Sequence, residues 1–383
     1  MRAAVLHAYN EPLSVEDVAL APPGTGEVSV RLHASGVCHS DWNTASGATP
    51  SPLPAVLGHE GAGVVEEVGE GVTSIAAGDH VVLSWLPSCG RCFFCRSGRV
   101  NLCSVAMPAM LDGALPGGAI RLSRRGAPVH HYSFLSTFAE RAVVPEASCV
   151  PIRRDAPLAV AALVGCAVMT GIGAAINRAR VTPGSTAVVF GAGGVGLSVV
   201  QGCRLAGALH IVAVDPLPFK RELALELGAT HAIEDGAGET LGLVRELTDG
   251  RGADYAFVAA GVPALVRRAF DALRLGGTLV CIGLPAEGTE VVLPGPELVR
   301  QEKIVTGTLY GSCRPHTDMP LVLDLFMEGR LELDRLVTRT YGLEEINEAL
   351  ADMTAGSVAR GVIDLAPPGV DLSTRRPRAQ VTA

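Results

Sequence analysis

The stretch that decides the fold is Gly191-Ala192-Gly193-Gly194-Val195-Gly196, which follows an apolar run at residues 185–190 and opens a helical pattern. In such a turn the first glycine permits a tight bend, the second lets the backbone approach a pyrophosphate, and the third allows the helix to pack closely on the strand. The helix N-terminus then presents N–H donors and positive potential to phosphates. We therefore predict that this segment binds the pyrophosphate of a dinucleotide.

Short apolar runs alternate with helical stretches on the C-terminal side of this turn. This alternation predicts right-handed βαβ units, and hence an α/β doubly wound parallel sheet of the Rossmann type with helices on both faces. The expected strands are residues 185–190, 210–215, 254–259 and 277–283, and the expected helices are residues 195–206, 219–227 and 264–273.

Asp215 ends the second of these strands. A carboxylate at this place can accept hydrogen bonds from both hydroxyls of an adenosine ribose, and its negative charge would repel a 2′-phosphate. We therefore expect NAD, and not NADP, as the cofactor. The alternative is a glycine-rich turn followed by an incidental acid.

The chain outside this region has a different pattern. Residues 1–150 are rich in strand signals, whereas the elements after residue 307 are too few to bury a core of their own and are expected to return to the N-terminal domain. The predicted domains are residues 1–165 with 308–366, residues 166–307 for NAD binding, and a tail at 367–383.

Composition narrows the class of protein. The 383 residues are 48% apolar and 18% charged, and Asp plus Glu (39) outnumber Lys plus Arg (31), so we expect a folded protein that does not bind nucleic acid. Residues 1–17 lack the pattern of a secretory leader, which favours the cytoplasm. The uncharged window at residues 156–177 is interrupted by glycines, and we expect a buried segment there and no membrane span.

Four of the ten cysteines are crowded into one short segment. Cys89, Cys92, Cys95 and Cys103 have a C-x2-C-x2-C-x7-C spacing, and four thiolates so close in sequence can form a closed tetrahedral site for a structural zinc ion. Four unrelated thiols in the same place would be prone to oxidation. Disulfides are not expected in so long a chain without a leader.

Cys38, His59, Glu60 and Cys166 are scattered, and spacing alone does not unite them. Each also has an ordinary structural interpretation: the cysteines as small core residues, the histidine as a satisfied turn residue, and the glutamate as a solvated charge.

The surrounding motifs supply the missing link. Several motifs occur along the chain in an order that resembles the zinc-dependent alcohol dehydrogenases of the medium-chain dehydrogenase/reductase superfamily. They are residues 36–41 (GVCHSD), residues 58–63 (GHEGAG), the four-cysteine segment, the pair Gly165-Cys166 followed by Thr170-Gly171, and the glycine-rich turn. The resemblance covers residues 2–365. It implies a β-rich, GroES-like catalytic domain beside the NAD domain.

The resemblance also implies roles for individual residues. A catalytic zinc ion would be held by Cys38, His59 and Cys166 with one open position, and two zinc ions per chain are therefore expected. Further roles would be Ser40 as the hydroxyl that hydrogen-bonds the substrate oxygen, Asp41 as acceptor for the other nitrogen of His59, Glu60 as a nearby acid, Trp85 in the substrate pocket, Thr170 and Val195 against the nicotinamide, His39 and Arg360 at the pyrophosphate, and Lys220 at the adenosine ribose.

Departures from the family pattern bear on the substrate. Asn43 stands where the animal enzymes have a histidine that ends a proton relay, and Met107 stands where the thiol-dependent formaldehyde dehydrogenases have an arginine. Thr49 and Ser51 lie where the latter enzymes carry acids. The favoured substrate is a neutral alcohol or aldehyde, and most of all a primary alcohol. One alternative substrate is a thiol adduct of formaldehyde. A further alternative is that the protein binds a nucleotide without catalysis. The excursion at residues 107–131 resembles in length that of the dimeric animal-type enzymes more than that of the short tetrameric ones, and this resemblance implies a homodimer.

Overall fold

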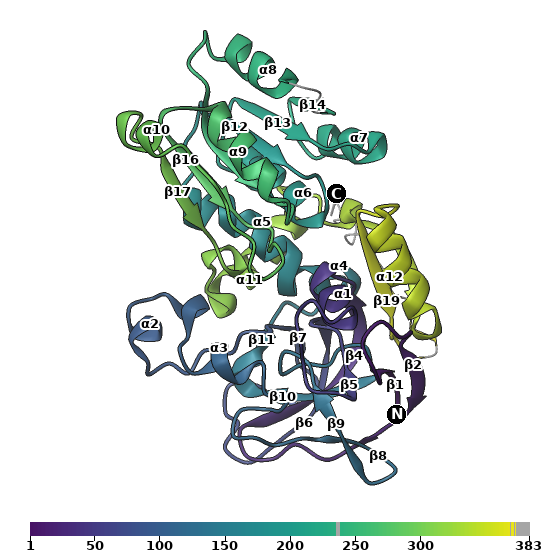
Figure 1. The fold of residues 1–383 in the computed structure, drawn as a ribbon. Coiled ribbons are helices and arrows are strands. Elements are labelled where there is room, and N and C mark those ends of the chain that lie inside the picture. Colours follow the sequence, from purple (N-terminus) through teal and green to yellow (C-terminus); the bar gives the residue numbers. More distant parts are fainter. Residues whose placement is uncertain (235–237, 368, 371, 373–383) are drawn as a thin grey trace, which may run out of the picture. The chain divides into compact units, whose positions relative to one another are not determined.

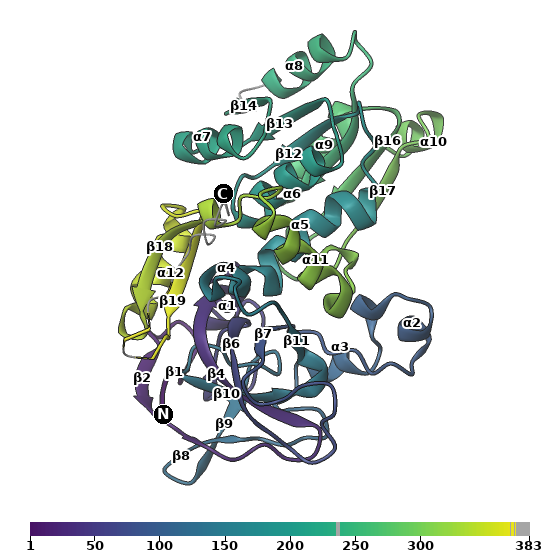
Figure 2. The same ribbon diagram turned by 180° about the vertical axis from the view of Figure 1, so that it is seen from behind.

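The computed structural model describes residues 1–234, 238–367, 369–370 and 372, so most of the expected tail at 367–383 lies outside the described residues. The chain forms two compact units, one of Met1–Cys166 with Arg314–Ala383 and one of Ala167–Cys313. Figure 1 and the reverse view in Figure 2 show a strand-rich part and a part in which helices alternate with strands.

The second unit is built on a six-stranded sheet in the order β14-β13-β12-β15-β16-β17, in which every neighbouring pair is parallel. Its strands are β12 (Thr186–Phe190), β13 (His210–Val214), β14 (His231–Ile233), β15 (Ala253–Val258), β16 (Leu273–Cys281) and β17 (Ile304–Gly307). Its helices are α5 (Met169–Gly173), α6 (Gly194–Leu205), α7 (Pro218–Glu226), α8 (Glu239–Leu247), α9 (Pro263–Ala272) and α10 (Gly295–Arg300). The predicted doubly wound parallel sheet is confirmed.

Strand β12 is the centre of this sheet. All five of its residues are buried, and Val188 is in register with Val212 of β13 on one side and with Ala256 of β15 on the other. The chain leaves β12 towards β13 and later returns to pair β15 on the opposite side. In open parallel sheets ligands bind at this reversal, beyond the carboxyl ends of the strands, and residues 191–196 follow β12 at that end.

The first unit contains two antiparallel-rich sheets. Its strands are β1 (Arg2–Leu6), β2 (Ser14–Asp17), β3 (Ala19–Leu20), β4 (Glu27–Gly36), β5 (Ala55–Val56), β6 (Glu60–Val68), β7 (His80–Leu83), β8 (Leu122–Arg124), β9 (Ala127–His131), β10 (Arg141–Pro145), β11 (Cys149–Pro151), β18 (Val337–Gly342) and β19 (Arg360–Asp364). Its helices are α1 (His39–Ala45), α2 (Phe93–Arg96), α3 (Ala106–Ala109), α4 (Leu158–Leu163), α11 (Pro315–Met327) and α12 (Ile346–Ala355).

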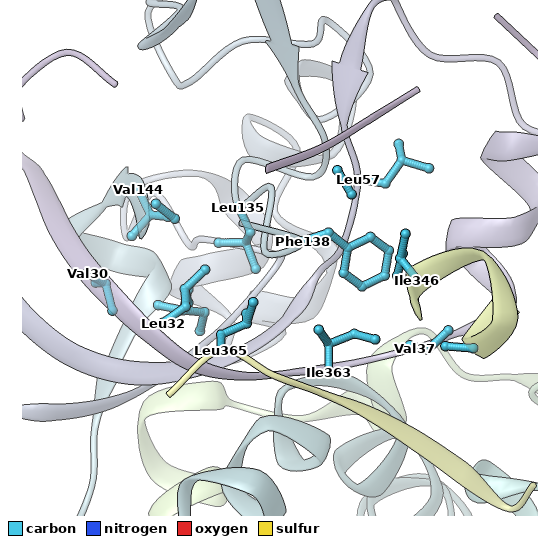
Figure 3. Close-up of a cluster of buried hydrophobic side chains, with 14 of the residues drawn as sticks. Val30, Leu32, Val37, Leu57, Leu135, Phe138, Val144, Ile346, Ile363 and Leu365 are labelled. Atoms are coloured by element: carbon cyan, nitrogen blue, oxygen red, sulfur yellow. The ribbon is translucent and has the colours of Figure 1, made fainter. Parts of the chain in front are cut away.

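The C-terminal segment of the first unit completes the larger sheet. Strand β19 pairs antiparallel with β4, Val362 facing Gly36, and the sheet order is β11-β7-β6-β4-β19-β18 with β10 also on β4. Figure 3 shows the core that results: Phe138 lies among aliphatic side chains from the N-terminal strands, together with Ile346 of α12 and Ile363 of β19. Each fully buried side chain of this kind contributes about 1.5–3 kcal/mol of transfer free energy.

One continuous helical stretch, Leu158–Ala179, is long and apolar enough to cross a membrane by length and composition, and 83% of its most apolar window is buried. Burial of this extent is that of a core helix, in agreement with the expectation for residues 156–177. Two π-helical stretches, Val164–Val168 and Ala174–Ala179, interrupt it.

Candidate active site and metal centres

The three scattered residues and the neighbouring glutamate come together in the first unit. Cys38, His59, Glu60 and Cys166 each offer one ligand atom, and these atoms all lie within 4.8 Å of one another. Cys38 is the N-cap of α1. His59 directly precedes β6, and Glu60 is the first residue of that strand. Cys166 lies in the π-helical stretch that follows α4. A set of two thiols and one imidazole is a zinc-type donor set.

Asp41 forms hydrogen bonds with two members of this cluster and with a neighbouring residue. Its carboxylate is fully buried and accepts three hydrogen bonds: from Nδ1 of His59 at 2.9 Å, from the amide of Gly58 at 3.2 Å, and from the amide of Cys38 at 3.0 Å. Because Nδ1 of His59 donates to a carboxylate, the neutral form of the imidazole has its lone pair on Nε2, which is the nitrogen that a metal ion would bind.

The electrostatics of the cluster favour a thiolate at one of its two cysteines and a thiol at the other. The pKa of Cys38 lies well below its usual value, chiefly because the Cys166 thiol hydrogen-bonds to it, and the pKa of Cys166 is raised correspondingly. Burial would lower the pKa of His59, but the Asp41 carboxylate and Cys166 outweigh it and hold this pKa well above the usual value. Considering the protein groups alone, the cluster holds one thiolate beside a protonated imidazole, and a dication can replace such protons.

Glu60 pairs with a residue that lies 300 positions away in the sequence. It is fully buried and forms an ion pair with the equally buried Arg360, the first residue of β19. Burial raises the pKa of Glu60 to about 7, although Arg360 opposes the shift. The other oxygen, Oε1, has no hydrogen-bond partner among the described residues. Arg360, expected at a pyrophosphate, is thus engaged with Glu60, and its contact with a cofactor stays a prediction.

Other predicted residues lie around the cluster. Ser40 is exposed on the first turn of α1, with Oγ 3.8 Å from Sγ of Cys38, and His39 beside it is exposed. Trp85 is partly buried and packs against the core of the first unit, so its place in a substrate pocket stays a prediction. Sequence reasoning missed Tyr132, whose ring forms a T-shaped pair with that of His59, with centroids 5.7 Å apart.

The four-cysteine segment forms a second cluster, in which the four sulfur atoms also lie within 4.8 Å of one another. Backbone amides donate to three of these sulfurs: Cys92 N to Cys89, Cys95 N to Cys92, and Cys89 N to Cys103, each at 3.4 Å. The bond from Cys95 N is the main reason that the pKa of Cys92 falls to about 5, whereas burial raises that of Cys95 to about 12. Amide donors that stabilise thiolates fit a tetrathiolate zinc site.

The glycine-rich turn in the second unit has the geometry that a pyrophosphate needs. Gly191 adopts φ +91°, which residues with a Cβ rarely tolerate, and a Cβ on Gly196 would collide with the carbonyl oxygen of Gly191. In contrast, a Cβ on Gly193, the N-cap of α6, would meet nothing within 4 Å, so backbone at this point is open to a ligand. Val195 is partly buried on the first turn of α6.

Asp215 follows β13 and is 6% exposed. Its carboxylate accepts from the amide of Ala192 at 2.8 Å and from the amide of Leu217 at 2.9 Å, one on each oxygen. Each oxygen keeps a second lone pair, so two ribose hydroxyls can still be accepted. Thr170 on α5 and Lys220 on α7 are partly buried in the same unit.

Comparison with known proteins agrees with this geometry. Residues 24–154 match the model of the alcohol dehydrogenase GroES-like domain, and residues 194–328 match that of the zinc-binding dehydrogenase. The chain is 45% identical over 365 residues to the NDMA-dependent alcohol dehydrogenase of Amycolatopsis methanolica, covering 94% of this chain and 98% of that protein. It belongs to the zinc-binding alcohol dehydrogenases of the medium-chain dehydrogenase/reductase superfamily.

Two further relatives show the range of the family around this chain. The S-(hydroxymethyl)glutathione dehydrogenase of Paracoccus denitrificans is 42% identical over 371 residues, covering 94% of this chain and 99% of that protein. The crystal structure of benzyl alcohol dehydrogenase from Acinetobacter calcoaceticus has a TM-score of 0.90 and 34% identity, and covers 95% of this chain and 98% of that one. The family membership makes the protein an oxidoreductase with GroES-like and Rossmann-type folds, as predicted.

Proposed function

We propose that this enzyme transfers hydride between a neutral primary alcohol and NAD⁺ in a zinc-dependent reaction. In the forward direction the alcohol carbon gives a hydride to C4 of the nicotinamide, the hydroxyl proton is released, and an aldehyde and NADH result. The observation that carries the proposal is the convergence of Cys38, His59 and Cys166, with Asp41 holding the other nitrogen of the imidazole.

Each unit has its own part in the proposal. Met1–Cys166 with Arg314–Ala383 would be the catalytic domain and Ala167–Cys313 the NAD-binding domain. In the latter, the open backbone at Gly193 would receive the pyrophosphate and Asp215 the ribose, with Thr170 and Val195 against the nicotinamide and Lys220 near the adenosine. NAD⁺ supplies the hydride acceptor.

In the catalytic domain the protein's task is to hold groups and move a proton. A zinc ion held by the three ligands would polarise the substrate oxygen and lower its pKa. The Ser40 hydroxyl, exposed beside Cys38, would hydrogen-bond that oxygen and accept its proton in relay, while Asp41 fixes the tautomer of His59. Since Asn43 cannot titrate, the proton would leave through water or another base.

The test combines metal analysis with turnover. The purified enzyme should contain two zinc ions per chain and should reduce NAD⁺ with some member of a panel from ethanol to benzylic and long-chain alcohols, followed by nicotinamide absorbance. Cys38→Ala and His59→Ala should each abolish turnover. Cys149→Ala, a matched change at a buried core cysteine that belongs to neither cluster, should not. Full activity in Cys38→Ala or His59→Ala would refute the metal assignment.

A second candidate reaction is supported by the similarity to S-(hydroxymethyl)glutathione dehydrogenase. Met107 on α3, in place of an arginine, argues against recognition of an anionic thiol adduct. Turnover of formaldehyde measured with and without glutathione decides between the two: dependence on glutathione would support the thiol reaction.

We further propose that the enzyme is a homodimer that acts in the cytoplasm. The support for a dimer is the long excursion at residues 107–131, whose length resembles that of the dimeric animal-type enzymes of the family. The support for the compartment is that the long apolar helix Leu158–Ala179 is buried as a core helix. Light scattering after gel filtration should give twice the chain mass of 39.5 kDa.

A further inference from the structure

Tyr132, directly after β9, contacts two members of the proposed active site. Its hydroxyl donates a hydrogen bond to the backbone carbonyl of Ser40 at 3.0 Å. Its ring and the imidazole of His59 form a T-shaped pair with an interplanar angle of 77° and a centroid separation of 5.7 Å, a favourable aromatic geometry. One side chain therefore touches both the imidazole that would bind the metal and the backbone that carries the proposed proton-relay hydroxyl.

The backbone directly after Tyr132 adopts a strained conformation. Ser133, Phe134 and Ser136 have φ angles of 50°, 62° and 56°, in the left-handed region that residues with a Cβ disfavour. Strain of this kind persists only where the surroundings over-determine the backbone, and it gathers at functional sites.

Local hydrogen bonds and packing supply that constraint. The Tyr132 carbonyl accepts the amides of Leu135 at 2.9 Å and Ser136 at 3.1 Å, and Oγ of Ser136 accepts the amide of Tyr132 at 3.0 Å. Phe134 and Leu135 are fully buried, Leu135 in the core drawn in Figure 3. The turn is thus anchored to the core while it aims Tyr132 at the cluster.

We propose that Tyr132 is a positioning residue for alcohol oxidation, with its ring orienting His59 and its hydroxyl holding the Ser40 backbone. The inference rests on the proposed function, because Ser40 acts there as the proton-relay hydroxyl. Ser40 is exposed on the first turn of a seven-residue helix, and its backbone carbonyl is the acceptor that the Tyr132 hydroxyl contacts. Since hydride and proton transfer require near-contact geometry, a small displacement of this backbone lowers the rate of the chemical step.

The two contacts can be separated by substitution. Tyr132→Phe keeps the ring and removes the hydroxyl; Tyr132→Leu removes both. The matched control is Tyr255→Phe, in the second unit, where an exposed tyrosine hydroxyl also donates to a backbone carbonyl, that of Arg180 at 3.3 Å. The full chain is loaded with zinc, and kcat, KM for alcohol, and the rate of zinc loss to a chelator are measured for each variant.

Tyr132→Phe should lose zinc at the wild-type rate but have a kcat about threefold to tenfold lower, with KM for alcohol little changed. Tyr132→Leu should in addition lose zinc about tenfold faster, because the orientation of His59 is no longer held. Tyr255→Phe should match wild type in all three readouts. A merely structural role would instead change zinc loss and kcat together in both Tyr132 variants.

Contrary outcomes bear on different claims. A wild-type kcat in Tyr132→Phe would overturn the role of the hydroxyl, and equal zinc retention in Tyr132→Leu and Tyr132→Phe would overturn that of the ring. If wild type oxidises no alcohol at all, the proposed function and the hydroxyl's role fall together, whereas zinc retention still reports on the ring.

Discussion

Replacement of Asp41 by Asn tests the central feature of the active site, because it changes the charge of the group that links the proposed ligands while keeping its shape. The two carboxylate oxygens accept from Cys38 N, Gly58 N and His59 Nδ1. An asparagine has one acceptor oxygen and one NH2 group, so at least one of these N–H donors must face another donor. The side chain is fully buried, and water cannot relieve the mismatch.

The size of the effect follows from these contacts. A hydrogen bond to a charged group is worth about 1.5–3 kcal/mol, which corresponds to about a tenfold to hundredfold change in an equilibrium constant. If the NH2 group turns to His59, the imidazole must accept at Nδ1 and carry its proton on Nε2, where the metal would bind. We therefore expect Asp41→Asn to weaken zinc binding at the catalytic site by about tenfold to hundredfold and to lower kcat with it.

The assay is competition with a chromophoric zinc chelator, with melting temperature and kcat followed in parallel. Asp254→Asn is the matched control: this carboxylate accepts from the amide of Thr186 at 2.8 Å and from Arg274 at 2.6 Å, in the unit that lacks both clusters. Both variants should lose some stability, but only Asp41→Asn should lose zinc affinity. Zinc affinity within twofold of wild type in Asp41→Asn would refute the idea that this carboxylate sets the tautomer of His59.

Three further predictions concern other parts of the chain. Cys103→Ser should lower the zinc content by one ion per chain, since it removes one sulfur of the four-cysteine cluster, and elemental analysis checks this. Asp215→Ser should raise KM for NAD⁺ by about tenfold and lower that for NADP⁺, because it removes both an acceptor for ribose hydroxyls and a negative charge; an unchanged ratio of the two KM values would contradict the cofactor assignment. Burial lowers the pKa of His131 from 6.5 to about 4. The unfolded chain therefore binds a proton that the folded chain does not between these pH values, and the free energy of unfolding should fall by about 2–3 kcal/mol as pH drops from 6.5 to 4. His131→Gln should lose less stability than wild type between pH 6.5 and pH 4, as measured by urea unfolding at these two pH values.

The sequence was most informative where local pattern determines structure. The expected strand at residues 185–190 is β12 (Thr186–Phe190), and the helix expected at 195–206 is α6 (Gly194–Leu205). Both rest on short-range signals, an apolar run and a glycine-rich turn, which need no knowledge of distant residues. The edge strand β17 was missed, because an exposed four-residue strand carries little apolar pattern.

Contacts between distant residues could not be predicted from pattern alone. Spacing does not show that Cys38 and Cys166 meet; the family motifs supplied that link. The π-helical stretch that carries Cys166 lies within a continuous apolar run, which gives no sign of a change in helical pitch. The contact between Tyr132 and Ser40 joins a strand end to a helix start 92 residues away in sequence, and neither residue belongs to a pattern that predicts it.

The buried charges suggest why one pocket can hold either protons or a metal ion. Considering the protein groups alone, a proton on His59 and one on Cys166 balance part of the negative charge of Cys38 and Asp41, while Glu60 is paired with Arg360. Zinc requires a neutral imidazole and two thiolates, so it replaces those two protons and leaves the net charge of the pocket unchanged. Zinc binding at this site should therefore release about two protons, as measured by calorimetry in buffers of different ionisation enthalpy. The affinity of this site for zinc should fall steeply with decreasing pH. If zinc binding releases no protons, the ligands are already deprotonated and other groups balance the charge.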